Sequence, residues 1–393
     1  MAQSSGNENS GPSWLGTARG HRARPFEWLV EKLIMLVSLS AILMVFLIFL
    51  FVARESLPIL FGQMDSSVAA EPVISPEEID QVPPERLRTY LGLSASEMKE
   101  FDQETLRLLV EVKAEEIANA PTDKDAGVNT VSWRYLLLPH QWTGYDQPEY
   151  IWQPVSQIHK YNIIPLFLGS LKATLVALLF AVPISLAAAI YVSQLAAPRT
   201  KEILKPIIEM LAGIPSVVLG FFALIVMASV LYPLYPEASR LNAIVAGLAL
   251  GFAIIPVVFS IAEDALTSVP RSYTQAALAL GSSKWQAAWK VVLPAAIPGV
   301  FAAVVLGFGR AIGETMIVLM ASGNASIMSL SLFDSVRTIT ATIAAELAET
   351  VFGGHHYRML FLLGTLLFAV TFISNLIADQ VIHRLKARLE GKG

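Results

Sequence analysis

Long apolar runs separated by short polar segments dominate the hydropathy pattern of this chain. Since about 20 apolar residues in a helix cross the hydrocarbon core of a bilayer, each of these runs is long enough to span it. The runs lie near residues 33–52, 163–192, 207–234, 242–262, 296–321 and 359–380. The pattern predicts an all-α integral membrane protein with six transmembrane helices.

The first run, residues 33–52, carries no charge and follows a basic segment at residues 1–32. This arrangement also occurs in secretory signal peptides. However, the run is longer than a typical signal core and lacks a small-residue cleavage site. We therefore expect a retained first transmembrane helix.

The distribution of Lys and Arg predicts the orientation, because cytoplasmic loops carry an excess of basic residues. With a cytoplasmic N-terminus, the inside segments hold 14 basic residues and the short outside loops hold only 4. The inside segments are residues 1–32, 193–206, 263–293 and the tail 384–393. We expect both termini to be cytoplasmic.

An acidic segment, residues 64–160, interrupts the apolar pattern with 17 Asp and Glu against 8 Lys and Arg. It predicts a small, mostly helical extracytoplasmic insertion between the first helix and a permease domain at residues 161–383. Within it, Ser94 and Glu97 have capping-box spacing, and one helical face is predicted from Phe101, Thr105, Leu108 and Val112. Asp123 and Asp125 are interpreted as part of a turn, because their surroundings do not fit a calcium loop.

Composition agrees with the membrane class: 54% of residues are apolar and 15% are charged, and the mean hydropathy is +0.56. A net charge of −4 gives no indication of nucleic acid. The chain has no cysteine, which excludes disulfides, thiol nucleophiles and thiolate metal sites. It has no phosphate-binding loop motif and no recognisable catalytic cluster, so we expect neither an enzyme nor a cofactor.

The polar segment at residues 269–298 predicts a helical hairpin. A first helix runs through Gln275 to Leu280, Gly281 breaks it, and a second helix carries Trp285 and Trp289 before the chain returns to the membrane at Pro294. Such a hairpin offers its two tryptophans either to a partner or to the lipid interface.

The same hairpin resembles the coupling loop of ABC importer permeases. That pattern has Glu-Ala-Ala, a glycine, and a closing Ile-x-Leu-Pro at fixed spacing, and here Gln275 and Val291 replace the glutamate and the isoleucine. The resemblance implies that residues 269–294 engage a separate ATPase, although Gln275 lacks the charge of the family residue. The implied coupling residues are Gln275, Ala277, Gly281, Trp285, Trp289, Leu293 and Pro294.

Further stretches narrow the resemblance to the permease subunits of bacterial phosphate importers. These stretches are "LAGIPSVVLGFFAL" at 211–224, "RAIGETMIVLMASGN" at 310–324 and "DSVRTITATIAAELAE" at 334–349. "GETMIVLM" and "HHYRMLFLLG" are similar to the C-type permease rather than the A-type. The resemblance implies the ABC importer permease fold in the bacterial inner membrane. It also implies a second permease subunit, a cytoplasmic ATPase dimer and a periplasmic phosphate-binding protein as partners.

Arg310 and Glu314 stand one helical turn apart inside the fifth apolar run. An arginine at the centre of a membrane helix costs about 2.5–3.5 kcal/mol, so its presence needs a reason. One hypothesis is a buried ion pair with Glu314, beside a close helix contact at Gly309 and Gly313. The other is a substrate pathway in which Arg310 binds the anion, Glu314 competes for Arg310, and Thr315 adds a hydroxyl.

Other polar groups near the membrane have ordinary explanations. Lys172 is expected to reach the interface with its charged end, and Pro215 and Pro256 are expected to bend their helices. Glu209, Glu263 and Asp264 lie at helix ends, where charges are common. His355 and His356 follow Glu346 and Glu349 without helical ligand spacing, so we expect no metal site.

Three alternatives to a phosphate permease remain at this point. The same machinery could move another oxyanion such as sulfate. An ion-coupled secondary transporter would need internal repeats and intramembrane carboxylates, and the chain shows only Glu314 clearly. A membrane sensor would use residues 64–160 as its receptor.

Overall fold

The computed structural model describes residues 25–64, 82–91, 101–119, 128–156 and 158–389. The chain divides into a first unit, Met1–Phe51, and a second unit, Val52–Gly393. Within the first unit the described part is helical and belongs to α1 (Pro25–Leu60). The predictions for residues 1–24 and for Ser94, Glu97, Asp123 and Asp125 lie outside the described residues.

The described residues contain six helical segments that are long and apolar enough to cross a membrane, as the sequence predicts. They are Trp28–Leu60, Ile164–Leu195, Ser216–Leu234, Ala243–Thr267, Lys284–Gly313 and His355–Leu385. Several boundaries differ from the prediction. The first segment extends to Leu60 rather than ending near residue 52, and the third begins at Ser216 rather than near residue 207. The fifth runs over Lys284–Gly313 rather than 296–321.

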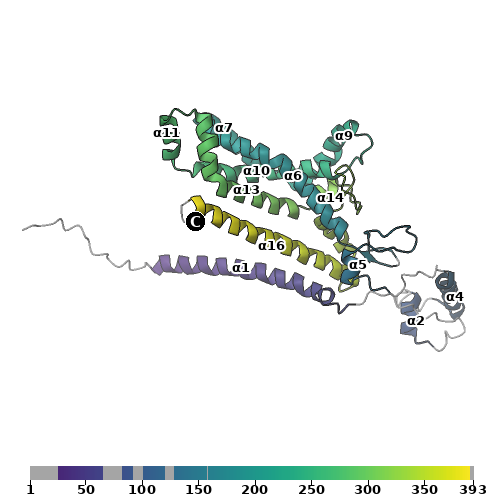
Figure 1. Ribbon diagram of the computed structural model, residues 1–393. Coiled ribbons are helices and arrows are strands. Elements are labelled where there is room, and N and C mark those ends of the chain that lie inside the picture. Colours follow the sequence, from purple (N-terminus) through teal and green to yellow (C-terminus); the bar gives the residue numbers. More distant parts are fainter. Residues whose placement is uncertain (1–24, 65–81, 92–100, 120–127, 157, 390–393) are drawn as a thin grey trace, which may run out of the picture. The chain divides into compact units, whose positions relative to one another are not determined.

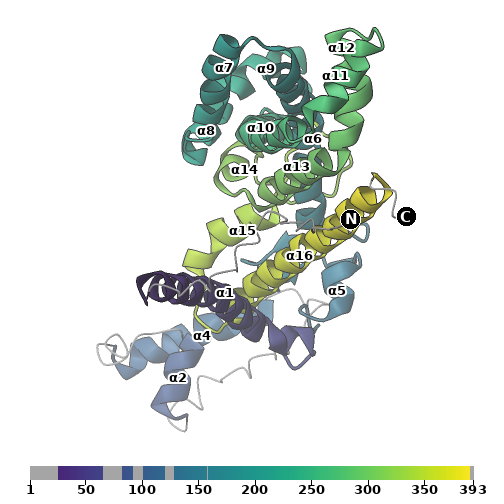
Figure 2. The same cartoon turned by 90° about the vertical axis from the view of Figure 1, so that its left-hand side faces the viewer.

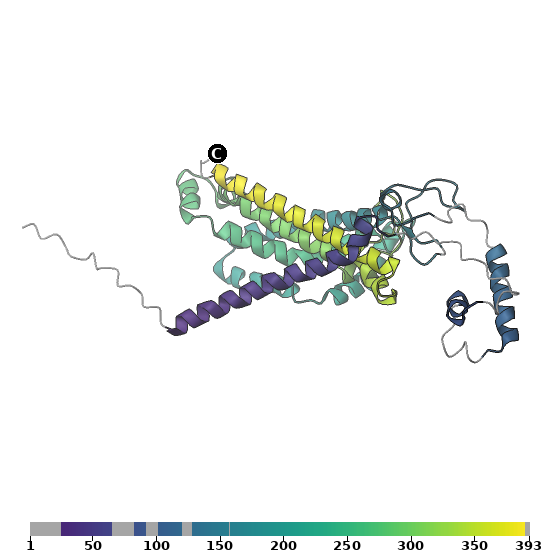
Figure 3. The same ribbon diagram turned by 90° about the horizontal axis from the view of Figure 1, so that it is seen from below.

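Four long helices of the second unit form a bundle: α6 (Ile164–Ile190), α10 (Ala243–Thr267), α13 (Leu293–Gly313) and α16 (His355–Leu389). Helix α10 packs against α6 and α13, and α13 packs against α16 (Figures 1 and 3). Helices α6 and α10 approach so closely at Gly251 that a Cβ there would lie 2.6 Å from the Phe180 ring. The bundle places α11 at one end and α5 at the other (Figure 1).

Between α6 and α10 the chain forms shorter helical pieces, visible in Figure 2. Pro215 caps the N-terminus of α8 and, with φ −59° and ψ 136°, separates it from α7. It therefore interrupts the helix completely, whereas Pro256 remains inside α10. The pieces are η2 (Tyr191–Leu195), α7 (Pro198–Leu211), α8 (Ser216–Phe222), η3 (Ala223–Met227), α9 (Ala228–Leu231) and η4 (Tyr232–Leu234).

The 269–298 hairpin follows α10, and two short helices precede α16. The hairpin contains α11 (Arg271–Ala279), α12 (Lys284–Ala287) and the π-helical turn η5 (Ala288–Val292), which continues into α13. Helix α14 covers Met316–Ala321, α15 covers Ile339–Glu346 and η6 covers Leu347–Glu349. Pro294 thus lies inside a continuous helical path and does not end the hairpin.

Part of the predicted acidic insertion shares a core with the bundle. Helix α5 (Trp133–Leu137) and the antiparallel pair β1 (Trp152–Gln153) and β2 (Lys160–Tyr161) contribute to it. The buried side chains of this part are Leu136, Trp152 and Tyr161. They pack with Leu166 of α6, Ile339 of α15, and Met359 and Leu363 of α16. Helix α5 and the strand pair are therefore packed as part of the bundle end.

The helical part of the insertion has its own small core. Helices α2 (Pro84–Leu91) and α4 (Gln103–Asn119) bury Leu87, Tyr90 and Val110 together. The predicted apolar face of α4 is wrong: Leu108 and Val112 are 58% and 62% exposed. The helix starts at Gln103, and the Asp102 carboxylate accepts a hydrogen bond from the Thr105 N–H at 3.0 Å. The Thr105 hydroxyl also donates to this carboxylate, and the hydroxyl and the N–H together lower the pKa of Asp102.

Candidate functional site

The hairpin after α10 is shaped by local signals. Gly281 has φ +87°, a left-handed conformation that glycine adopts without strain, and it lets the chain reverse between α11 and α12. Ser283 and Gln286 form a capping box: the Gln286 N–H donates to Ser283 Oγ at 3.2 Å and the Ser283 N–H to Gln286 Oε1 at 2.9 Å. These contacts fix where the second helix starts.

Large apolar side chains cover the exposed side of this hairpin. Trp285 and Trp289 stack with ring centroids 5.8 Å apart and remain 56% and 50% exposed. Leu280 is 88% exposed and Gln275 is also exposed, whereas Ala277 is buried. A contiguous exposed apolar surface of this kind is typical of a binding surface.

A buried carboxylate holds α7 against α10 at the same end of the bundle. Glu263 is 1% exposed, and its carboxylate pairs with Lys201 Nζ at 2.9 Å and Lys205 Nζ at 2.7 Å. The hydrogen bond that Lys205 Nζ donates to the Glu263 carboxylate raises the pKa of Lys205. The sequence treated Glu263 as an ordinary helix-end charge, and the tertiary structure instead makes it the centre of an ion-pair network.

The predicted continuous helix over residues 296–321 is wrong at Glu314. Helix α13 ends at Gly313, and Glu314 has φ −69° and ψ 136°. Helix α14 then begins at Met316. Glycine and β-branched residues are poor helix formers, and Gly313 and Thr315 flank this position. The interruption at Glu314–Thr315 is called the α13–α14 break below.

The break separates the two charges that a continuous helix would bring together. Arg310 is exposed on the last turn of α13, and in the described part of the chain it forms no ion pair with Glu314 or another residue. The hypothesis of a buried Arg310–Glu314 ion pair is therefore wrong for this structure. The reason is that Glu314 leaves the helix before the one-turn spacing is completed.

The same face of α13 is uncovered around Arg310. A Cβ added at Gly309 or Gly313 would meet nothing within 4 Å. No described helix of this chain therefore packs closely against these glycines. This face leaves room for a helix of another subunit, together with the Arg310 guanidinium.

Glu314 and Thr315 line two adjoining spaces at the break. The Glu314 carbonyl accepts a hydrogen bond from Thr340 Oγ1 at 2.8 Å, and its own carboxylate accepts one from the Thr315 N–H at 3.2 Å. Thr315 and Thr340 line an open groove of about 450 Å³ beside α15. The groove is otherwise lined by Ile343, Ala344, Leu347 and Ala348.

Thr340, in α15, is the part of the site that the sequence reasoning missed. Thr338, Thr340 and Thr342 alternate in "TITAT", and all three are buried. Thr338 Oγ1 accepts the Ala341 N–H at 3.2 Å and so caps α15. The sequence signal that could have indicated Thr340 is the threonine at every second position of an apolar segment.

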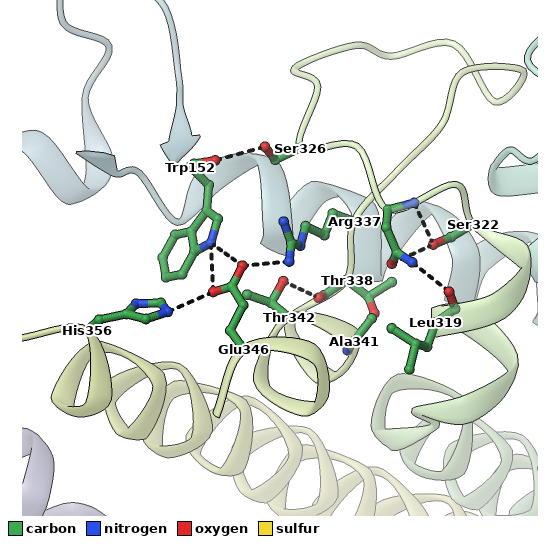
Figure 4. Close-up of polar contacts among 11 residues, drawn as sticks. Trp152, Leu319, Ser322, Ser326, Arg337, Thr338, Ala341, Thr342, Glu346 and His356 are labelled. Atoms are coloured by element: carbon green, nitrogen blue, oxygen red, sulfur yellow. Dashed lines mark hydrogen bonds and ion pairs between the residues drawn. The ribbon is translucent and has the colours of Figure 1, made fainter. Parts of the chain in front are cut away.

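Both ends of α15 are anchored by polar contacts. At its start, the Ile339 N–H donates to Ser170 Oγ of α6 at 2.9 Å. At its end, the Glu346 carboxylate pairs with Arg337 Nη2 at 2.5 Å and His356 Nε2 at 3.2 Å, and Trp152 Nε1 donates to it at 3.2 Å (Figure 4). Burial and this nearby carboxylate raise the pKa of Tyr161.

Glu346 and His356, which the sequence considered for a metal site, do meet in space. Arg337 occupies the same carboxylate, however, and a cation there competes with any metal ion. No group of three or more His, Cys, Asp and Glu side chains suited to a metal ion occurs among the described residues. The contacts instead join α15 to α16 and to the strand pair.

Lys172 has a different environment from the one predicted. It is 6% exposed, and its Nζ donates to the Ser329 carbonyl at 2.6 Å and the Ser331 carbonyl at 2.8 Å. It does not extend to solvent but holds the loop between α14 and α15. The ammonium is buried and takes these two loop carbonyls as its acceptors.

We expect Lys172→Met to loosen this loop, because the Ser329 and Ser331 carbonyls lose their shared donor. Hydrogen bonds to charged groups contribute about 1.5–3 kcal/mol. Limited proteolysis of the purified assembly should cut near residues 326–333 faster than in the unchanged protein. Lys290→Met, at an exposed lysine, is the matched control, and equal cleavage of both variants would contradict the assignment.

The sequence of this chain is similar to a family profile of transport components and to individual permease proteins. The sequence profile described as "Binding-protein-dependent transport system inner membrane component" matches residues 181–389. YqgH of Bacillus subtilis, a probable ABC transporter permease protein, is 34% identical over 235 residues, covering 60% of this chain and 76% of that protein. The region matched by the profile contains the hairpin, the α13–α14 break and α15.

Two phosphate transport system permease proteins named PstC show similar identity. That of Mesorhizobium japonicum is 32% identical over 256 residues, covering 60% of this chain and 77% of that protein. That of Pasteurella multocida is 34% identical over 264 residues, covering 61% and 80%. Among solved structures, a chain of the inward-facing MetNI methionine ABC transporter aligns with 55% of this chain and 93% of its own length, with a TM-score of 0.45 and 17% identity.

Proposed function

Because this chain belongs to the family of inner-membrane components of binding-protein-dependent transport systems, we propose that it is the permease subunit that carries inorganic phosphate in an ATP-driven importer. The similarity to PstC permeases supports this substrate. Within the chain, the phosphate assignment depends on one observation: Arg310 is an exposed cation on a membrane-spanning helix.

Arg310 is suited to an oxyanion. An exposed guanidinium in a membrane helix must face water, a partner protein or a ligand, because hydrocarbon disfavours it by about 2.5–3.5 kcal/mol. Its planar fork of donors matches two oxygens of a tetrahedral anion. The substrate pathway in this proposal includes Arg310, Glu314 and Thr315, with Glu314 repelling the anion after it has passed or competing for Arg310.

The uncovered face around Gly309 and Gly313 is assigned to the second permease subunit. Small residues let the backbones of two membrane helices approach closely, and the pathway would then lie between the two subunits beside Arg310. A space lined by both subunits provides the water-filled or protein environment that the charge requires.

The 269–294 hairpin is assigned to the ATPase dimer. This chain supplies no nucleotide-binding motif, so the energy of transport comes from ATP hydrolysis by those partner subunits. The exposed Trp285, Trp289 and Leu280 provide an apolar contact of the kind that dominates binding energy at protein interfaces. Gln275, Gly281, Leu293 and Pro294 keep the hairpin in the geometry that the resemblance implies.

The topology follows from this assignment. The basic segments 1–32, 193–206, 263–293 and 384–393 lie on the cytoplasmic side, which places both termini there. Residues 64–160 then face the periplasm, where the phosphate-binding protein delivers its ligand. No cofactor or metal is part of the proposal.

The proposal is tested by uptake of labelled phosphate and labelled sulfate in cells that lack their own importers of both anions. The cells express this chain with its neighbouring permease, ATPase and binding protein. Phosphate uptake that stops when the ATPase is inactivated supports the proposal. Sulfate uptake instead assigns another oxyanion, and an assembled complex without flux of either anion favours the sensor.

A further inference from the structure

A hydroxyl group connects α15 to the α13–α14 break. Thr340 Oγ1 lies 2.8 Å from the Glu314 carbonyl and 3.2 Å from Thr338 Oγ1. Thr340 is 7% exposed, and it lines both the open groove with Thr315 and a small enclosed space with Glu314. The contact joins two segments that are 26 residues apart in sequence.

The direction of each hydrogen bond in this chain of hydroxyls is determined. A carbonyl oxygen only accepts, so the single Thr340 proton goes to Glu314. Thr338 must then donate to Thr340, while its oxygen accepts the Ala341 N–H at 3.2 Å. The Glu314 carbonyl, which the end of α13 leaves without a helical continuation, thereby obtains a donor from α15.

The two anchored ends of α15 make this contact a defined link. Ser170 holds the start of α15 on α6, and Arg337, His356 and Trp152 hold Glu346 at its end (Figure 4). Because α15 is fixed to the surrounding helices, the Thr340 hydrogen bond fixes the position of the break relative to them. Losing this bond frees Glu314 and Thr315 to shift.

An anion in the groove would compete for the same proton. Hydrogen bonds to a charged acceptor are roughly twice as strong as those between neutral groups. We propose that Thr340 is a latch. Its hydroxyl donates a hydrogen bond to the Glu314 carbonyl in the empty transporter, and it donates to a phosphate oxygen instead when substrate enters the groove. This inference rests on the proposed function for the identity of the anion.

The test uses the complete complex in lipid vesicles, with ATP hydrolysis measured without phosphate and uptake measured over a range of phosphate concentrations. Thr340→Val removes the hydroxyl at nearly constant volume. We expect hydrolysis without substrate to rise about fivefold, equivalent to ~1 kcal/mol, because the break is released. The phosphate concentration for half-maximal uptake should also rise about fivefold, because one donor is lost.

Two further variants make the result specific to the latch. Thr340→Ser keeps the hydroxyl and should restore both quantities. Thr342→Val is the matched control, because the Thr342 hydroxyl is buried in the same helix but donates to the Thr338 carbonyl at 2.8 Å within α15. It should leave both quantities unchanged. If Thr340→Val does not assemble, Thr340→Ala provides the same test.

An assembled Thr340→Val complex with unchanged hydrolysis would overturn the latch. So would an equal rise in Thr342→Val, which would indicate general loosening of α15. If the unchanged complex moves no phosphate, the proposed function fails separately, and the hydrolysis measurement, which needs no substrate, still tests the link between α15 and the break.

Discussion

Replacing Arg310 by glutamine should reduce phosphate uptake by about ten- to a hundredfold while the complex assembles normally. Hydrogen bonds to charged groups contribute about 1.5–3 kcal/mol, which corresponds to this range at 1.4 kcal/mol per factor of ten. The side chain forms no ion pair within the described residues, so its loss should leave the fold of this chain intact.

Two other arginine variants show whether the loss of uptake comes from the charge of Arg310, from its planar donor fork, or from removing any exposed arginine. Arg310→Lys keeps the charge but loses the planar fork, so we expect an intermediate loss of uptake. Arg240→Gln serves as the control, since Arg240 is exposed and donates to Ser229 Oγ at 3.0 Å, away from α13. Uptake is the readout, with assembly checked by purification of the complex. Normal uptake by an assembled Arg310→Gln complex would exclude Arg310 from the pathway.

Replacing Trp285 and Trp289 together by alanine should separate this subunit from its ATPase. Aromatic hot-spot residues at the centre of an interface contribute about 2 kcal/mol or more each, so we expect binding to weaken by roughly a thousandfold. The stacked, half-exposed indoles are not part of the bundle core. Their removal should therefore preserve the permease fold.

The measurement is the amount of ATPase that co-purifies with this chain, together with ATP-dependent phosphate uptake. Trp28→Ala is the matched control, because Trp28 is 54% exposed on α1 outside the hairpin. Full retention of the ATPase by the double variant would show that the hairpin tryptophans contact lipid, the alternative that the sequence left open.

Several features of this protein could be predicted because they depend on neighbouring residues alone. The number of apolar helices follows from hydropathy over windows of about 20 residues. The hairpin follows from Gly281 and from the i, i+4 spacing of Trp285 and Trp289. The importance of Arg310 follows from the cost of a charge in an apolar segment.

The errors of the sequence reasoning share one physical cause: contacts between segments distant in the sequence decided what the local pattern left open. For α4 the apolar residues allowed two faces, and packing against Leu87 and Tyr90 of α2 selected the one with Val110. The continuous fifth helix was predicted because hydropathy does not register a break of two residues. The interruption at Glu314 is stabilised by Thr340, whose position no local pattern around Glu314 could indicate.

The sequence by itself determined which segments cross the membrane and which segment offers tryptophans to a partner, because hydrophobic burial and helix periodicity act over short stretches. Only the tertiary structure decided the partners of the polar groups. Lys172 meets the Ser329 carbonyl and Glu346 meets Arg337 through folding of distant segments. In an apolar bundle each buried donor must find an acceptor, and which acceptor lies within reach depends on how the helices pack.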